Sequence, residues 1–547
     1  MGAKLKQFGF VNWLTLGAII LVGGFHTYIA CLLSVAMCVY LVLRLKKGIV
    51  RYPGILGTGV LLLCLGYGLS CLWAVDPGMA FTGFLKFLSV GLYLLCLWQE
   101  EKTTELLEAL PGFGAACVVL SALLAYAPLI GDYFRVAGRM AGFFQYPNTF
   151  AVFLLLCQLL SLRKAGKGWL DYVFLAILTG GILLTGSRTV FVLAVVADAL
   201  MILFCSRKKG RVLLIYGGIC LLVVLLALNE DFILHRYLTI SLGESTFVGR
   251  VLYLVDALVL VLRYPFGMGY MGYYYIQGSI QTGVYSVTYA HNELLQLLLD
   301  VGWIPTIVFA IALGKWFFRK DVSSTDRILV GTLLAHCLFD FDLQFVGMVF
   351  LLLALMHRPG KPIRIKKTGW VRPLAGATAV VSLYMAVALG LAHLGAYRAA
   401  DVLYPYNTAN MLKMLSQTTD LEEANTLSDR ILAQNQDYYA PYTMKAKYAY
   451  SQGDFTGVIQ NKRKAFETNP FGWEEYEEYC QMLLRGIPLY AQMGDNSSAE
   501  LCRQELINAQ QRLRSNADRL SPLGKKIQDQ PITELSPAVQ AEIEKMN

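Results

Sequence analysis

The sequence predicts an all-α, polytopic membrane protein that ends in a soluble helical domain. Three observations predict this class: apolar segments follow one another, charged residues are scarce, and the sign of the charge changes near residue 393. Hydrophobic residues make up 56% of the 547 residues and charged residues only 16%, against about 25% in a typical soluble chain. The mean hydropathy is +0.50. Cytosolic globular enzymes, nucleic-acid-binding proteins and disordered scaffolds are disfavoured, because each needs more polar surface.

Thirteen apolar segments can be assigned as membrane spans, each near the length of about 20 residues that crosses a bilayer as a helix. They lie near 10–24, 26–43, 54–73, 79–98, 111–130, 149–162, 170–186, 189–205, 212–228, 293–314, 327–341, 344–357 and 373–393. The 327–357 pair is short, so the expected count is 12 or 13. We expect no cleaved signal peptide, because a second span follows the first without an A-x-A site.

The basic residues set the orientation of these spans. One side of the membrane holds 24 Lys and Arg residues, whereas the loops of the other side hold six, all arginine. Cytoplasmic loops are the ones enriched in Lys and Arg. We therefore expect a multi-pass protein of the cell membrane with a cytoplasmic N-terminus and, for an odd number of spans, an extracytoplasmic C-terminal domain. The six outer arginines run against the bias and are candidates for function.

The longest outer loop, about 229–290, is expected to contain a helix on the membrane surface. Its segment Val251–Arg263 is apolar but too short to span. The aromatic stretch Tyr270–Tyr275 fits either the headgroup level or an ordinary aromatic belt. Gly267–Gly272 matches G-x-G-x-x-G but lacks the strand–turn–helix context of a nucleotide site. We interpret it as a flexible approach loop.

The C-terminal part differs from the membrane body in charge and in pattern. Residues 1–393 carry a net charge of +13 and residues 394–547 a net charge of −4. Within the tail, residues 440–470 resemble a tetratricopeptide repeat, and such repeats stack into a concave binding surface. The tail therefore either binds a partner or glycan, or is a helical cap without a ligand. We expect it to fold as a separate domain that the membrane body does not need for folding.

The twelve cysteines show no spacing typical of a metal site. Ten lie in the apolar body, where a thiol behaves as a small hydrophobic group. Cys480 and Cys502 lie in the tail, and they either form a disulfide or remain free.

Polar segments on the outer side contain the candidate site residues. An arginine is costly on the side that otherwise excludes positive charge, so an anion contact is favoured for Arg188, in the G-S-R at 186–188. Arg139 and Arg250 occupy comparable places, the first before a span and the second in the long loop just before the surface segment. Asn148, which opens a span after a proline, is explained equally by helix capping.

Two further segments add histidines and carboxylates. His291 and Asn292 open the span after the long loop, and a helix N-terminus favours neutral imidazole, which suits a base near pH 7. The alternatives are an interfacial side chain for His291 and a helix cap for Asn292. His336, Asp340 and Asp342 end the eleventh span. They either serve a function or pair with one another to fix a re-entrant turn.

Taken in order, these segments resemble the O-antigen ligase and polysaccharide polymerase family of polytopic glycosyltransferases. The resemblance covers roughly residues 10–357, and the tail departs from it, which leaves the acceptor open. The matching pieces are R-x-x-G-x-x-x-x-P-N at 139–148, G-S-R at 186–188, G-R at 249–250, P-F-G-M-G-Y at 265–270, A-H-N-E-L-L-Q at 290–296 followed by Gly302, and H-x-x-x-D at 336–340.

The resemblance implies transfer of a glycan from an undecaprenyl diphosphate carrier to an acceptor hydroxyl on the outer face, without metal or cofactor. A diphosphate leaving group gains negative charge, which guanidinium groups stabilise. We expect Arg188 and Arg250 to form this clamp with help from Arg139, and His291 to take the proton of the acceptor. The expected substrate-binding residues are Arg139, Asn148, Asn292, His336 and Asp340.

Three other functions remain open. A polymerase would join repeat units, whereas a ligase moves a finished glycan to a lipid, protein or wall acceptor, and the motifs do not separate the two. A flippase or other transporter predicts charges along a central path and internal repeats, neither of which the sequence suggests. A non-catalytic scaffold displaying the tail leaves the outer arginines and His291 without a role. The sequence does not indicate the sugar, the linkage, the acceptor or the oligomeric state.

Overall fold

The computed structural model describes residues 8–44, 49–51, 54–100, 103–165, 168–206, 208–227, 236–238, 241, 243–358, 362–364 and 369–545. Helices dominate these ranges, which confirms the all-α class. The membrane body contains α2 (Phe10–Ile20), η1 (Val22–Gly24), α3 (Thr27–Arg44), α4 (Gly54–Ser70), α5 (Pro77–Leu97), α6 (Thr104–Leu124), α7 (Gly131–Phe134), η3 (Gly142–Phe144), α8 (Pro147–Lys164), α9 (Trp169–Leu184), α10 (Arg188–Cys205), α11 (Lys209–Ala227), α13 (Ser245–Arg263), α14 (Gly272–Ile280), α15 (Glu293–Val301), α16 (Trp303–Phe317), α17 (Ser324–Cys337), η4 (Asp342–Gln344), α18 (Val346–Met356) and α19 (Val371–His393).

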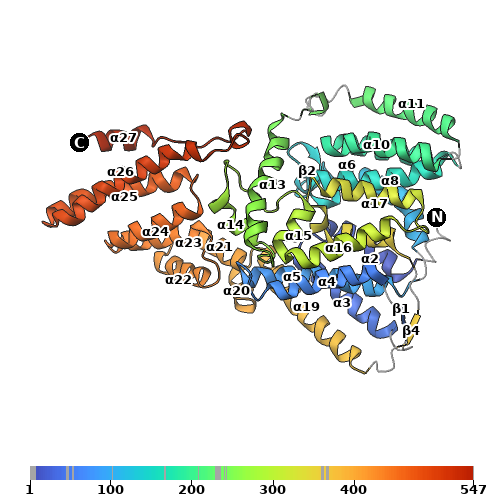
Figure 1. The fold of residues 1–547 in the computed structure, drawn as a ribbon, viewed down its shortest axis with the longest axis horizontal. Helices are drawn as coiled ribbons and strands as arrows, with labels where there is room; N and C mark the ends of the chain where they lie inside the picture. Colours follow the sequence, from blue (N-terminus) through green and yellow to red (C-terminus); the bar gives the residue numbers. More distant parts are fainter. Residues whose placement is uncertain are drawn as a thin grey trace.

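Twelve of the thirteen expected spans each coincide with one main helix, the span at 293–314 is divided between two, and most of these helices run side by side in one bundle (Figure 1). Six helices are long and apolar enough to cross a membrane by length and composition alone: α3, α5, α6, α10, α13 and α19. Helix α8 forms the centre of the bundle, because every residue from Pro147 to Leu162 is buried. The chain is therefore a polytopic membrane protein.

Two short strands show that connections assigned to one side of the membrane do meet. Strand β1 (Ile49–Arg51) follows α3, and β4 (Pro362–Arg364) precedes α19; the two pair in antiparallel fashion. Near them, Arg358 forms an ion pair with Asp326 at 2.7 Å. Several basic residues used for the orientation, among them Lys46, Lys47, Lys167 and Arg207, lie outside the described residues, as does the start of the long outer loop. The direction of the termini across the membrane stays a prediction.

Helix α13 crosses the ends of the bundle instead of joining it (Figure 1). It begins where Glu244 caps the N–H groups of Thr246 and Phe247. Its packing partners are α14, α15 and a turn of the tail. An apolar stripe, Val255, Leu258, Val259 and Leu262, is exposed along it. This arrangement fits the surface helix that the sequence predicts.

The span expected at 293–314 is broken in two. Gly302, with φ +80°, separates α15 from α16, and the loop before α14 packs into this break. The N–H of Trp303 donates to the carbonyl of Pro265 at 2.9 Å. A Cβ on Gly267 would lie 2.6 Å from the backbone of residues 300 and 302. The prediction of a flexible approach loop is therefore wrong: these glycines permit close backbone packing.

The tail consists of antiparallel helices that extend from the end of the body where α13 lies, opposite to β1 and β4 (Figure 1). Helix α23 packs on α24, and α25 on α26. Cys480 and Cys502 are both buried and free. Assignment of the tail to tetratricopeptide repeats stays a prediction. Its elements are α20 (Tyr397–Leu403), α21 (Thr408–Gln417), α22 (Leu421–Leu432), α23 (Tyr439–Ser451), α24 (Phe455–Thr468), α25 (Trp473–Gln492), α26 (Asn496–Ser515), η5 (Asn516–Arg519), η6 (Gly524–Lys526) and α27 (Pro537–Glu544).

Candidate active site

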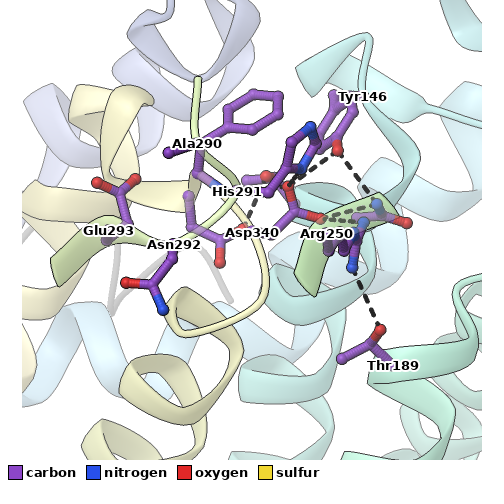
Figure 2. Close-up of polar contacts among 12 residues, drawn as sticks. Tyr146, Thr189, Arg250, Ala290, His291, Asn292, Glu293 and Asp340 are labelled. Atoms are coloured by element: carbon purple, nitrogen blue, oxygen red, sulfur yellow. Dashed lines mark hydrogen bonds and ion pairs between the residues drawn. The ribbon is translucent and has the colours of Figure 1, made fainter. Parts of the chain in front are cut away.

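A buried carboxylate lies at the centre of the candidate site. Asp340 sits in the turn between α17 and α18, and its side chain is fully buried. Its oxygens accept hydrogen bonds from Arg250 Nη2 at 3.1 Å, from the Tyr146 hydroxyl at 2.9 Å and from Asn148 Nδ2 at 2.8 Å. Figure 2 shows Arg250, Tyr146 and His291 directed at this carboxylate from three different segments. One short turn thus gathers groups that are distant in the sequence.

His291 is the second partner of Asp340. Its Nδ1 lies 3.3 Å from Asp340 Oδ1, and its side chain is 18% exposed. The residue has φ +50°, a left-handed conformation that is unusual for a histidine and is often found at functional positions. A carboxylate at Nδ1 fixes the orientation of the ring and leaves Nε2 to face a substrate. The ring therefore lies beside a carboxylate as in a histidine–carboxylate pair, and its role as a base stays a prediction.

The other polar residues of the A-H-N-E-L-L-Q segment position His291. Asn292 caps α15 by accepting from the N–H of Leu295 at 2.9 Å, and its Nδ2 donates to the carbonyl of Leu338. Glu293 accepts from the N–H of Leu343 at 2.6 Å, which ties α15 to the turn beyond Asp340. In Figure 2 both side chains point away from Asp340. The capping alternative for Asn292 is thus what the structure shows; contact with substrate stays a prediction.

Neighbouring groups stabilise the negative charge of the Asp340 carboxylate. Burial by itself would raise the pKa of this carboxyl, but the Arg250 guanidinium, the His291 hydrogen bond and the His336 ring outweigh it and hold the pKa well below its usual range. Asp340 therefore remains ionised across the physiological range. A buried ionised carboxylate fixes its partners strongly, because leaving any of them unpaired is costly.

Further arginines surround the G-S-R turn at 186–188. Arg139 Nε donates to the carbonyl of Thr185 at 2.7 Å, and its Nη2 donates to Asn148 Oδ1 at 2.6 Å. Arg236 Nε donates to the carbonyl of Gly186 at 3.3 Å. A Cβ at Gly186 would lie 3.2 Å from that Nε atom, so the glycine allows the close approach. Asn148 bridges Arg139 and Asp340 and is not a cap, which corrects the capping interpretation.

Arg188 and Arg250 are linked through the start of α13. Arg188 Nη2 lies 2.9 Å from Oε1 of Glu244, the residue that caps this helix. Burial would raise the pKa of Glu244, but the hydrogen bond and charge of Arg188, together with the hydrogen bonds from Thr246 and Phe247, outweigh it and lower the pKa. Arg250 Nη1 lies 3.5 Å from the hydroxyl of Thr189, directly after Arg188. The two arginines therefore border the same region from α10 and α13.

Positive charge exceeds negative charge at this site. Four arginines, Arg139, Arg188, Arg236 and Arg250, lie with two paired carboxylates, Glu244 and Asp340. Burial and the neighbouring Arg236 lower the pKa of Arg139 to about 10, so that it is still charged at neutral pH. A diphosphate carries several negative charges, and arginine binds phosphate through two parallel N–H groups. The excess positive charge fits such an anion.

The H-x-x-x-D segment at 336–340 divides into two parts. His336 Nδ1 lies 2.5 Å from Oδ2 of Asp342, and both side chains are fully buried. The other oxygen of Asp342 accepts from the hydroxyl of Thr149 at 2.8 Å. The His336–Asp342 pair fixes the turn, which agrees with the alternative that these residues pair with one another. Asp340, in contrast, faces the site. A substrate contact by His336 stays a prediction that its burial does not favour.

Three residues of the site escaped sequence reasoning: Tyr146, Arg236 and Glu244. Arg236 is one of the six outer arginines, so its position against the charge bias was a usable signal. Tyr146 and Glu244 carry no such signal, because each acts through a contact with a distant segment. Within the described ranges, no three His, Cys, Asp or Glu side chains come together as ligands for a metal ion. Independence of metal stays a prediction.

A comparison with protein families places part of this site in a known domain. Residues 173–310 match the family model described as O-antigen ligase. The matched range includes Arg188, Arg250 and His291, and it ends before Asp340. Searches of curated proteins and of solved structures found no match.

Proposed function

Because residues 173–310 match the O-antigen ligase family model, we propose that the protein is a membrane glycosyltransferase of polysaccharide biosynthesis that takes its glycan from undecaprenyl diphosphate. Transfer to an acceptor hydroxyl takes place at the outer face of the membrane, without metal or cofactor. The observation that carries the proposal is the convergence of Arg250 and His291 on one buried carboxylate, Asp340. Neither a scaffold nor a simple anchor needs this arrangement.

The reaction is a single displacement at the anomeric carbon of the donor. The acceptor oxygen forms the new glycosidic bond while the bond to the diphosphate oxygen breaks, and that oxygen keeps the electron pair. Nε2 of His291 takes the acceptor proton, and Asp340 stabilises the resulting imidazolium from the opposite side of the ring. A single displacement inverts the anomeric configuration.

The arginines stabilise the leaving group. Negative charge builds up on the diphosphate as the anomeric bond breaks. Hydrogen-bond donors that are held in place before the reaction therefore lower the barrier. Arg250 is fixed by Asp340 and Arg188 by Glu244, and neither side chain is fully exposed. Arg139 and Arg236 extend the positive region around the same turn. The clamp is therefore organised before the substrate arrives.

A polymerase that joins repeat units remains the alternative within the class, because it uses the same donor and the same chemistry. A lipid-linked glycan transporter is the alternative from another class, and its action would form no new bond. The acceptor separates the first two functions, and the tail is the part that differs from a simple ligase.

The experiment is reconstitution of the purified full-length protein with lipid-linked glycan and candidate acceptors, followed by mass analysis of the products. A product heavier than the acceptor by one glycan, together with free undecaprenyl diphosphate, supports the ligase. Products that differ by whole repeat units support the polymerase. An unchanged donor that only moves between the faces of the vesicle contradicts transfer and supports the transporter.

A further inference from the structure

A segment of the tail reaches back to the surface helix that carries Arg250. We name Ser521–Gln528 the strap; it includes η6 and lies against α13 (Figure 1). The strap belongs to the C-terminal end of the chain, more than 250 residues after α13. It thus connects the tail to the candidate site through one helix.

The strap contacts the first turns of α13 by one hydrogen bond and one apolar cluster. The N–H of Gln528 donates to the hydroxyl of Ser245 at 2.8 Å. Ile527 is buried in a cluster with Val248 and Leu252 of α13 and with Tyr285. Both contacts lie in the half of α13 that holds Arg250.

A close backbone contact fixes the strap on the neighbouring loop. The N–H of Ser521 donates to the carbonyl of Thr282 at 2.9 Å. A Cβ on Gly524 would lie 2.1 Å from that carbonyl oxygen, so that only glycine fits. The same loop is tied to α13, because Asp256 accepts from the N–H and the hydroxyl of Thr282 at 2.8 and 2.7 Å. Strap, loop and helix therefore form one packed unit.

The strap and the site lie on opposite faces of α13. Successive residues of an α-helix turn by about 100°, so residues two apart point in nearly opposite directions. Arg250 is two residues from both Val248 and Leu252, which share a buried cluster with Ile527. On its own face, Arg250 reaches Asp340. Helix α13 is thus held between the strap and the buried carboxylate.

The half of α13 that holds Arg250 lies outside the buried cluster that ties Ala257, Leu260 and Val261 of the other half to α14 and α15. The helix does not run within the bundle, and an apolar stripe along it is exposed. Its other packing partners are α14 and α15. A displacement of this helix would move Arg250 and would also move Glu244, the partner of Arg188. A shift of about 1 Å in a positioned group can slow a reaction by up to about a hundredfold.

We propose that the strap is a positioning element of the transfer site, which seats α13 so that Arg250 and, through Glu244, Arg188 are in place for the leaving diphosphate. This inference rests on the proposed function. It gives the tail a role in the chemistry, in addition to any binding surface. Ile527 and Gly524 act through Arg250 and are positioning residues.

The test compares Ile527→Ala with Ile543→Ala in the full-length protein. Ile543 packs, partly buried, on the core of the tail and lies outside the strap, so it is the matched control. We expect Ile527→Ala to lower kcat about tenfold with little change in KM for the donor, because the clamp acts mainly in the transition state. Ile543→Ala is expected to keep the parental kcat. Equal losses in both variants would overturn the proposal, because they would indicate general weakening of the tail.

A double-mutant cycle separates the strap from the proposed function. Since Ile527 acts through Arg250 and, by way of Glu244, through Arg188, Ile527→Ala is expected to slow the Arg250→Ala protein by a smaller factor than it slows the parental protein. Additive losses would overturn the strap proposal while leaving the site intact. An Arg250→Ala protein with the parental rate would instead contradict the proposed function. Gly524→Val provides a second variant, which is expected to behave as Ile527→Ala does. If both variants keep the parental kcat while Arg250→Ala is slow, the strap proposal is also overturned.

Discussion

Nη2 of Arg250 lies 3.1 Å from Oδ2 of Asp340 and joins the surface helix to a turn 90 residues later. The Asp340 side chain is fully buried and that of Arg250 is 14% exposed. The attraction between the two charges is therefore stronger than it would be in water, and removal of either partner would leave the other charge buried and unpaired. His291 shares the same carboxylate. The clamp and the base of the proposed reaction thus depend on one residue.

Asp340→Asn is expected to abolish most of the transfer activity. The substitution keeps the size of the side chain but leaves the Arg250 charge without its buried partner, at a cost of about 3 kcal/mol. It also removes the carboxylate that orients His291. Initial transfer rates and the melting temperature in detergent, measured on the same preparation, check this. Asp321→Asn is the control, because that carboxylate pairs with Arg319 on the surface. Parental turnover in a folded Asp340→Asn protein would remove Asp340 from the site.

His291→Ala is expected to lower kcat and to change its pH dependence. Without the base, transfer depends on ionisation of the acceptor hydroxyl itself, so residual activity rises with pH. The measurement is kcat of both proteins between about pH 6 and pH 10, and the rate of the variant is expected to rise more steeply at high pH than that of the parent. His393→Ala is the control, since this exposed histidine ends α19 away from Asp340. A variant that loses activity by the same factor at every pH would argue against the base.

Truncation after residue 394 is expected to leave an inserted membrane body that transfers glycan slowly. The body has its own buried core around α8, separate from the core of α24, α25 and α26. The rate falls because the strap on α13 is lost. Membrane extraction and detergent gel filtration measure insertion. Complete degradation of the truncated chain, beside a stable full chain, would show that the two parts do not fold independently.

The orientation is tested by labelling an introduced cysteine with an impermeant thiol reagent in intact cells. The native tail thiols Cys480 and Cys502 are buried, so Ser497→Cys, at an exposed position, is the better probe. An extracytoplasmic tail predicts labelling without permeabilisation. Labelling of Ser497→Cys only after permeabilisation would reverse the orientation. The parental protein gives the labelling of the native thiols, among them the partly exposed Cys71, which is subtracted.

Much of the fold follows from apolar length and charge bias, and the exceptions have physical causes. The sequence predicts the Val251–Arg263 segment as a surface helix because it is too short to span, but helix α13 begins at Ser245 and its 19 residues are long enough to cross a membrane, so its surface placement stays a prediction. The break at Gly302 was not predicted, because the loop that packs into it lies some 35 residues earlier in the sequence and leaves no periodic signal. The docking of the tail on α13 depends in the same way on contacts between distant segments.

The candidate site shows the same division. Arg188, Arg250 and His291 were predicted because each is unusual where it stands, at the outer edge of an apolar body. The sequence did not predict the partner of each residue. Arg188 pairs with Glu244, whereas Arg250 and His291 both lie beside Asp340. Asn148 was expected to bind substrate, with helix capping as the alternative from its place after a proline, whereas its amide links Arg139 to Asp340. Local patterns cannot separate a cap from a long-range bridge.

Replacement of the arginines separates an enzyme from a transporter. If Arg188 and Arg250 stabilise a charge that grows in the transition state, each Arg→Ala change costs about 3 kcal/mol, or roughly a hundredfold in rate. Donor binding weakens less than kcat. Arg→Lys restores only part of the activity, since lysine lacks the planar pair of donors. Together with His291→Ala, the losses are far from additive, because the three residues serve one step.

The most direct measurement is the initial rate of glycan transfer by correctly inserted Arg188→Ala and Arg250→Ala proteins, each beside the parental protein and an Arg263→Ala control. Arg263 is an outer arginine that contacts the ring of Tyr264 and lies at the far end of α13 from the site. We expect the control to match the parent and both site variants to be slower by roughly a hundredfold. Transfer at the parental rate by either site variant would contradict the assignment of the active site.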